Sequence, residues 1–418
     1  MSTAAQSQPV ERASDRFLSQ SGSSIEELVE AALDREPGLQ ASRRKIDAAE
    51  GRERQGALRP NPTLSVSRNE EIDGTDNNTM IGVAWPLDLW RKPARVAAAE
   101  RGTDVARAEL LDRERLLAAE IRRAAGDLLA AVRSLRVIED LLEASRRFAE
   151  LVDARVREGA TPTLERGLVQ VEVSRIASEL ALSEALAETA ILEVKRLSGL
   201  MPDSQLALRE DLERAVRASA RNEDRRSIDE RPDVKAAEAR VAATGALQDL
   251  ARREGRADAS LVASYSRADM GFPQLGFGPT GGIERVRGIF HRIELGMSWQ
   301  VPLLNRNQGE VAALQSERAA AQQEAVRVRL AAAAELASAE VRERKALEAV
   351  KIYSRDVLAQ ARENLDVLRE SYELGRYALL DVIDGERRYL EVEEGYTEAL
   401  LELYQAQVDL RRARGGIQ

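Results

Sequence analysis

Two carboxylates in the C-terminal part of the chain are the residues best placed for chemistry. Asp381 and Asp384 are three positions apart, so a helix would carry both on one face. Paired carboxylates of this kind attract cations, and rings of them form cation-selective constrictions. The alternative is a solvated acidic face, with Arg387 and Arg388 as ion-pair partners. The choice between them depends on the elements that hold these side chains.

The composition offers few residues of the types that catalyse reactions or bind metals. The chain has no cysteine and a single histidine, His291, which excludes disulfides, thiolate metal sites and multi-histidine metal centres. We expect His291 to be an ordinary surface residue in a polar loop. Many Asp and Glu pairs have helical spacing, as expected on the solvated faces of a chain that is 32% charged. We therefore expect no enzyme, no cofactor and no resident metal.

The overall composition is typical of long helices, because charged residues are abundant and aromatic residues make up only 4%. The net charge of -9 argues against a nucleic-acid partner, since such proteins usually carry a basic face. No run approaches the roughly 20 apolar residues of a transmembrane helix.

The sequence repeats itself at a fixed offset. Pro86 and Pro302 are 216 positions apart, as are Gly159 and Gly375, and Pro37 answers more loosely to Pro232. A constant offset indicates two copies of one structural unit. We predict a first repeat over 24–230 and a second over 231–418.

Residues 1–23 are polar and rich in Ser and Gln, which predicts a disordered leader ahead of the repeats. They contain no hydrophobic segment that resembles a signal peptide. From this we expect either a cytoplasmic protein or a sequence given without its export signal.

Each repeat contains a very long helical stretch. Helices are predicted over 24–36 and 37–58, and the longest over 91–157 and 307–374, since these two stretches contain almost no proline or glycine. At 1.5 Å per residue, about 67 residues give a rod of about 100 Å. Each rod ends at a glycine, Gly159 or Gly375, and the chain then returns in another helix. For the first return we expect Pro162 at the first helical position, behind Thr161 as its cap.

Short alternating runs lie between the helices and predict two strand hairpins, over 62–88 and 259–303. In the second hairpin a Gly-rich loop is expected from Met270 to about Gly288. The runs are nine or ten residues long, which is the length of a tilted membrane strand. Strands that face lipid cannot leave open edges, so other copies of the chain would have to complete the sheet. The alternative is an ordinary half-buried sheet in a soluble α+β domain.

The arrangement resembles the TolC-like outer-membrane efflux protein family over nearly the whole chain. The resemblance rests on the duplication and on four strings of residues, and it looks closest to the branch that serves cobalt-zinc-cadmium efflux. The strings are Glu36-Pro37-Gly38-Leu39, Leu58-Arg59-Pro60-Asn61-Pro62-Thr63-Leu64, Arg155-Val156-Arg157-Glu158-Gly159 and Tyr372-Glu373-Leu374-Gly375-Arg376.

The resemblance implies a mainly α fold with a membrane β-barrel. Three copies would supply twelve strands to one barrel in the outer membrane and twelve helices to a long periplasmic tunnel. It also implies a periplasmic adaptor and an inner-membrane pump of the resistance-nodulation-division class as partners, beside outer-membrane lipid. The chain would then be a passive exit duct for heavy-metal cations or drugs. The alternatives are a polypeptide-secretion duct of the same fold and a soluble coiled-coil scaffold.

The resemblance also assigns roles to particular residues. Asp381 and Asp384, six and nine positions after Gly375, would form two rings of carboxylates at the periplasmic entrance, the selectivity gate. Tyr372 and Glu165 would join the two hairpins in a latch at the tips. Its basic member is expected two positions after Gly375, where this chain has Tyr377. The nearest basic residue is Arg376, which we include as its basic member. The turns at Gly159, Thr161 and Gly375 would dock the adaptor.

Overall fold

The structure is a computed structural model that describes residues 12–416 apart from 73, 75, 221–226 and 354–356. The chain divides into two compact units. One is formed by the segments up to Arg43, Glu109–Lys235 and from Arg327 onward, and the other by Arg44–Ala108 and Ala236–Val326. Each unit therefore draws on both predicted repeats, and the units do not coincide with the repeats.

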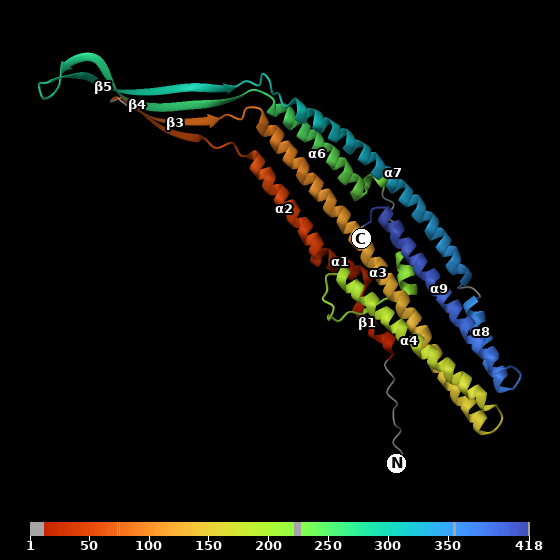
Figure 1. The fold of residues 1–418 in the computed structure, drawn as a ribbon. Helices are drawn as coiled ribbons and strands as arrows, with labels where there is room; N and C mark the ends of the chain where they lie inside the picture. Colours follow the sequence, from red (N-terminus) through yellow and green to blue (C-terminus); the bar gives the residue numbers. More distant parts are fainter. Residues whose placement is uncertain (1–11, 73, 75, 221–226, 354–356, 417–418) are drawn as a thin grey trace. The chain divides into compact units, whose positions relative to one another are not determined.

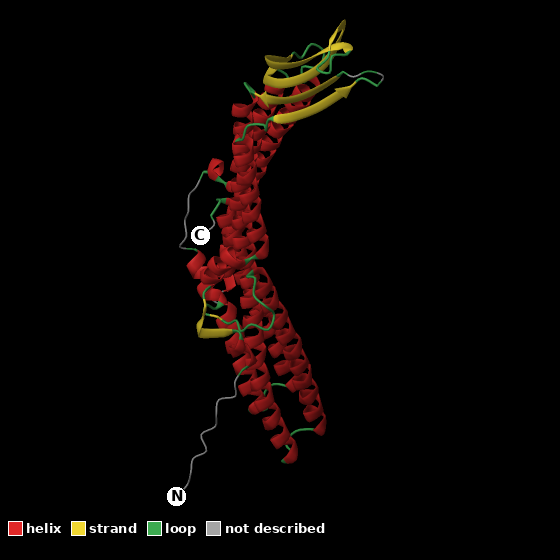
Figure 2. Ribbon diagram, turned by 90° about the vertical axis from the view of Figure 1, so that its left-hand side faces the viewer, coloured by secondary structure: helices red, strands yellow, loops and turns green. Residues whose placement is uncertain are grey.

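The first unit is mainly helical and contains two helical hairpins. Their turns lie at the same end of this unit in both views (Figures 1 and 2). Its own elements are η1 (Ala13–Arg16), β1 (Leu18–Ser23), α1 (Ile25–Arg35), α4 (Thr163–Leu197), α5 (Leu212–Ser219), η2 (Ile228–Glu230), α8 (Leu358–Glu373) and α9 (Leu379–Ala413). The helices with residues in both units are α2 (Pro37–Ala57), α3 (Arg91–Arg157), α6 (Pro232–Glu254) and α7 (Gln308–Ile352).

A continuous apolar core joins the helices of this unit. Large side chains of α3 pack with residues of α1, α4, α5 and α9, and many of them are fully buried. Burial of this kind is the main stabilising term in the unit. Representative members of the core are Leu28, Ile121, Leu128, Leu135, Ile191, Leu212, Leu400, Leu403 and Tyr404.

The duplication extends to the bounds of the helices. The returning helices α4 and α9 both contain 35 residues, and their first and last residues are 216 positions apart. The ends of α3 and α8, Arg157 and Glu373, have the same offset. Glycines with positive φ follow them, Gly159 at 76° and Gly375 at 69°. The predicted internal duplication is confirmed.

Both turns use the same backbone hydrogen bonds. After α3, Ala160 N donates to Arg155 O at 2.9 Å and Gly159 N to Val156 O at 3.1 Å. After α8, the nitrogens of Arg376 and Gly375 donate to Ser371 O and Tyr372 O, each at 2.9 Å. This is the Schellman arrangement, in which a residue in the left-handed region satisfies the last helical carbonyls. Glycine suits it because a side chain would be strained at that φ.

The predicted second rod over 307–374 is not one regular α-helix. Helix α7 ends at Ile352 and α8 begins at Leu358, and the flanking residues Tyr353 and Val357 lie in π-helical turns. The Tyr353 ring packs against Tyr396, with 6.5 Å between centroids. Its hydroxyl occupies the space that a side chain at Gly395 would need. The absence of proline and the scarcity of glycine in this stretch predicted an unbroken α-helix, and they carry no information on π-helical turns.

The leader prediction is wrong for residues 12–23, and residues 1–11 lie outside the described part of the chain. Phe17 between η1 and β1 is buried and belongs to the main core. Its carbonyl accepts a 2.9 Å hydrogen bond from Leu208 N, and Ser23 N donates to Ala207 O at 3.0 Å. One buried ring and these backbone bonds order a segment whose composition is that of a disordered one.

The start of α4 also differs from the prediction. Helix α4 begins at Thr163, and Pro162 is its N-cap residue, with an extended ψ of 146° and no side-chain cap. Thr161 is therefore one position too early to cap the helix.

The second unit contains one antiparallel sheet with the strand order β2 (Thr63–Glu70), β3 (Asn77–Pro86), β4 (Asp258–Phe277) and β5 (Ile283–Gln300). The register aligns the predicted apolar residues into rows, for example Leu64, Val83, Ala263 and Leu295. Leu64 and Leu295 are 67% and 82% exposed. The sheet face is therefore uncovered within the described residues, unlike the half-buried sheet of a soluble domain.

The second strand hairpin is longer than predicted. Most of the expected loop from Met270 to Gly288 is strand, since Leu275 pairs with Arg285 and Phe277 with Ile283 beyond an irregularity after Gly271. Gly276 and Gly288 are paired within the strands, Gly271 lies at the irregularity, and the remaining glycines lie in the tight turn at 278–282. His291 is also in β5 rather than a loop, and its Nδ1 lies 2.6 Å from the Tyr265 hydroxyl. None of the described helices is both long and apolar enough for a membrane span.

Candidate gate and latch at the hairpin tips

Tyr372, in the last turn of α8, joins the two hairpins of the first unit. Its hydroxyl donates a 2.6 Å hydrogen bond to Glu165 Oε2 in the first turn of α4. Its ring forms a T-shaped pair with the ring of Phe148, with 5.2 Å between the centroids, and only 4% of Tyr372 is exposed. Burial, followed by the nearby Glu165 carboxylate, raises the pKa of Tyr372 to about 12. The hydroxyl is therefore a hydrogen-bond donor across the physiological pH range.

Arg155 is the basic residue that meets Tyr372. Its Nη1 atom donates to Tyr372 O at 3.0 Å and to Glu373 O at 2.8 Å. Its guanidinium carbon also lies 5.2 Å from the centre of the Tyr372 ring. A cation at the C-terminal carbonyls of α8 is stabilised by the helix dipole and by the aromatic ring. Arg155 thus links α3 to α8, and sequence reasoning missed it, although it stands in the tip string four residues before Gly159.

Arg376 does not take part in this contact. Its side chain is exposed, and among the described residues no hydrogen bond or ion pair of that side chain is found. The neighbouring Tyr377 is exposed as well. The structure brings together Tyr372 and Glu165 of the predicted latch and leaves Arg376 apart from them.

Asp381 and Asp384 lie on the exposed side of α9, and each has a partner within its own chain. Asp381 Oδ2 accepts a 2.9 Å hydrogen bond from Ala378 N and so caps the start of α9. Asp384 Oδ2 lies 2.7 Å from Arg388 Nη2. Arg387 instead forms an ion pair with Glu172, at 3.2 Å between Nη2 and Oε2. Both aspartates line a groove of about 780 Å³ between α8 and α9. As isolated side chains they match the solvated acidic face that the sequence left open.

The tip carboxylates occupy equivalent positions in the two copies. Glu165 and Asp381 are 216 positions apart, each the third residue of its helix. The duplicated position has diverged, since Glu165 reaches the other hairpin whereas Asp381 caps its own helix. Asp384 corresponds to Leu168 in the first copy. Only the second tip can therefore contribute both carboxylates.

Two buried glutamates join the hairpins further from the tips. Glu172 on α4 is 5% exposed and lies between Arg175 at 2.9 Å and Arg387 of α9. These arginines lower the pKa of Glu172 against the opposing effect of burial, which is the largest single contribution. On α9, Glu386 accepts from Ser145 of α3 at 3.1 Å and from Arg369 of α8 at 2.7 Å. A buried carboxylate needs such partners, so both glutamates hold neighbouring helices together.

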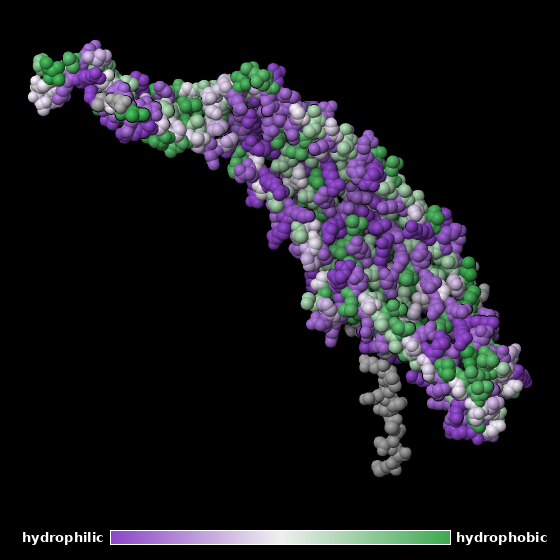
Figure 3. All heavy atoms as spheres, viewed as in Figure 1, coloured by the Kyte–Doolittle hydropathy of each residue, from purple (hydrophilic) through white to green (hydrophobic). Residues whose placement is uncertain are grey.

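The turns predicted to dock a partner are exposed. Gly159 and Gly375 both lie on the surface, and Thr161 is half-buried. Figure 3 shows a hydrophobic patch, in green, over the α8–α9 tip. Exposed apolar residues of this region include Val367, Leu374, Tyr377 and Leu380. A patch of this kind is typical of a surface that contacts another protein.

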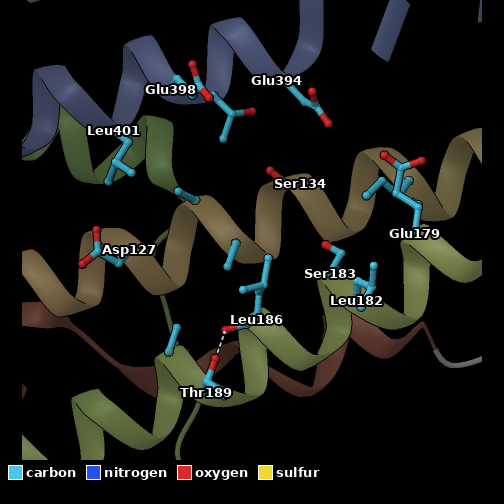
Figure 4. A pocket seen from close by; sticks show the side chains of 15 residues that line it. Asp127, Ser134, Glu179, Leu182, Ser183, Leu186, Thr189, Glu394, Glu398 and Leu401 are labelled. Carbon is cyan, nitrogen blue, oxygen red and sulfur yellow. Dashed lines mark hydrogen bonds between the residues drawn. The ribbon is translucent and has the colours of Figure 1, made fainter. Parts of the chain in front are cut away.

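A second hollow lies between α3, α4 and α9 and is lined by acidic and apolar residues (Figure 4). Glu179 comes from α4, whereas Glu394 and Glu398 come from α9. Burial first, and then the charges of the neighbouring glutamates, raise the pKa of Glu394. Among the residues that the structure describes, no cluster of three or more side chains able to hold a metal ion is found.

The sequence profile of the outer membrane efflux protein family matches residues 28–200 and 225–416. The chain belongs to this family of efflux channels. It therefore forms an outer-membrane exit duct of an efflux system, with the long helical hairpins and short sheet of the TolC-like fold.

Individual relatives of this efflux protein agree with the family assignment. It is 22% identical to the cobalt-zinc-cadmium resistance protein CzcC of Cupriavidus metallidurans, over 93% of this chain and 90% of the relative. It is 25% identical to the pyoverdine export outer membrane protein OpmQ of Pseudomonas putida, over 91% of this chain and 77% of the relative. A solved structure of the channel protein CusC superposes with a TM-score of 0.73 at 17% identity, covering 100% and 99% of the two chains. The family match argues against the soluble coiled-coil scaffold considered from the sequence.

Proposed function

We propose that three copies of this chain assemble into one duct that crosses the outer membrane and extends through the periplasm. In the assembly a periplasmic adaptor docks on the hairpin tips, and an inner-membrane pump of the resistance-nodulation-division class supplies the cargo. The efflux channel itself needs no catalytic step. It opens and closes an exit path.

The observation that carries this proposal is the uncovered sheet. Within the described residues, β2 and β5 each pair on one side only, and the apolar residues of one face are exposed along all four strands. Edge strands with free backbone groups are not tolerated in lipid, so further strands must meet both edges. Three sheets of this kind would supply twelve strands, and an even number of strands can close into a barrel.

The gate follows from the positions of Asp381 and Asp384 around a threefold axis. Each carboxylate would then form a ring of three, and stacked acidic rings favour cations at a constriction. Their exposure in the single chain supports this proposal, since neither side chain is committed to the helical core. Mutual repulsion within each ring also means that nearby cations or basic side chains are needed to stabilise it.

The latch consists of Tyr372, Glu165 and Arg155, with the Glu172 and Glu386 contacts behind it. These contacts hold the α3–α4 hairpin against the α8–α9 hairpin. Docking of the adaptor at Gly159, Thr161 and Gly375 would favour a state in which some of them are broken. An adaptor can shift this equilibrium only by binding the open state more tightly than the closed one.

Small cargo is favoured over polypeptides, since the relatives CzcC and OpmQ are named for metal resistance and for pyoverdine export. We propose heavy-metal cations or small organic molecules as cargo, with the choice made by the pump. The duct has only to pass what the pump delivers.

Conductance in planar lipid bilayers tests the proposal. The purified trimer is expected to form small, cation-selective openings, and Asp381→Ala/Asp384→Ala is expected to give larger and less selective ones. No channels from correctly folded trimer would overturn the duct. Unchanged conductance and selectivity in the double variant would overturn the gate and leave the duct in place.

A further inference from the structure

One basic side chain shares the stripe of α9 that carries the gate aspartates. Asp381, Asp384 and Arg388 follow one another at spacings of three and four residues, so they fall within about 60° around the helix. All three line the same groove of about 780 Å³ between α8 and α9. Among the described residues that line this groove, Arg388 is the one cation, and the α8 side chains opposite are neutral.

Arg388 is engaged with the gate rather than with the helical core. Its Nη2 atom lies 2.7 Å from Asp384 Oδ2, and the side chains are 77% and 59% exposed. The adjacent Arg387 contacts Glu172 of the other hairpin instead. The two arginines therefore differ in role, although both were candidate partners of the acidic face.

We propose that Arg388 is a specificity-determining residue of the channel, because it offsets the charge of Asp384 at the gate. This inference rests on the proposed gate. Around a threefold axis, two acidic rings would be followed, about one helical turn along α9, by a basic ring. The formal charge of the constriction would then be half that of the aspartates alone.

A weak ion pair is sufficient for this role. Exposed pairs between residues four apart contribute little to folding stability. A permeating ion nevertheless responds to every fixed charge near the constriction, whether or not that charge is paired. The basic ring lowers the attraction for cations and the repulsion of anionic groups. It therefore suits cargo that carries both signs of charge as well as simple cations.

Reversal potentials in a salt gradient test the inference. Arg388→Gln is expected to raise the cation-to-anion permeability ratio about two- to threefold, since one positive charge per chain is lost near the pore axis. Arg388→Lys keeps the charge and is expected to retain the wild-type ratio. The matched control is Arg147→Gln, because Arg147 forms a similarly exposed pair with Glu143 four residues earlier, at 3.1 Å on α3.

The outcomes separate this inference from the gate itself. If Asp381→Ala/Asp384→Ala changes the selectivity whereas Arg388→Gln does not, Arg388 has no role and the gate stands. If neither variant changes it, the gate proposal fails together with this one. An equal rise in the Arg147→Gln channel would also overturn the inference, because the effect would then come from net charge. Migration of each variant as a trimer verifies that the fold is intact.

Discussion

The Tyr372 hydroxyl donates a 2.6 Å hydrogen bond to Glu165 Oε2 across 207 positions of sequence. It connects α8 to α4, and the same tyrosine accepts the Arg155 guanidinium at its backbone carbonyl. One side chain in the last turn of a helix thereby joins both hairpins of the first unit. Its loss is expected to loosen the tips without disturbing the main core.

Tyr372→Phe is predicted to open the channel more readily. The substitution removes the donor but keeps the ring between Phe148 and Arg155. A partly buried hydrogen bond to a charged group stabilises by about 1.5–3 kcal/mol. We therefore expect open probability in planar bilayers to rise by about tenfold or more, since 1.4 kcal/mol corresponds to a factor of ten.

Tyr389→Phe provides the control for this experiment. Tyr389 also donates to a glutamate, Glu393 at 3.1 Å, but both residues belong to α9. Its loss leaves the link between hairpins intact and is expected to leave open probability unchanged. Equal effects of the two variants would contradict a latch at Tyr372.

Arg155→Gln is predicted to weaken the same tip from the side of α3. The variant loses the charge over the Tyr372 ring and the hydrogen bonds to the last carbonyls of α8. We expect a rise in open probability that is not additive with Tyr372→Phe, because the two residues are in contact. Arg157→Gln is the control, since Arg157 pairs with Asp153 of its own helix. Strict additivity in the double variant would argue that the two contacts act separately.

The fold was largely predictable from sequence, because the internal repeat and the residues that end helices can both be recognised in the sequence. Proline and glycine marked the bounds of α2 and α3 to within one residue, and alternation located the strands. Composition wrongly predicted that residues 12–23 are disordered, because the burial of Phe17 orders a segment that is otherwise polar. It also misplaced the loop before Gly288, since strand pairing resumes beyond the irregularity after Gly271 and continues to Phe277 and Ile283.

The candidate site was only partly predictable. Tyr372 and Glu165 could be paired from the resemblance, and the structure places them in contact. Arg155 could not be chosen, because helical spacing relates residues of one helix and says nothing about which arginine meets a neighbouring hairpin. The pairing of Arg388 with Asp384 is a local spacing of four and was within reach of the sequence.

Gly375→Ala is predicted to destabilise the second tip. Gly375 has a φ of 69°, at which an alanine is strained by about 1–2 kcal/mol. Gly167→Ala is the matched control, because Gly167 lies within α4 and an added methyl group would meet no atom within 4 Å. Alanine has a higher helix propensity than glycine, so Gly167→Ala should be more stable than the wild type by about 0.5–1 kcal/mol. Hydrogen exchange of the tip amides measures both, and a protected tip in Gly375→Ala would contradict the prediction.

Glu394→Gln is predicted to stabilise the protein at high pH and to have no effect in acid. The pKa of Glu394 is raised from its ordinary value of 4.5, because burial and nearby glutamates disfavour the charged form. The folded state therefore binds this proton more tightly, and stability falls as pH rises from the ordinary value through the folded pKa. Removing the charge should raise the thermal midpoint at pH 8 by on the order of 1 °C, and by nothing at pH 3. The control is Glu348→Gln, for which the change in thermal midpoint at pH 8 is expected to have the opposite sign. Lys345 at 2.7 Å stabilises the charged form of Glu348 and lowers its pKa. Unfolding followed by circular dichroism decides the matter, and a gain that persists at pH 3 would exclude the charge as its cause.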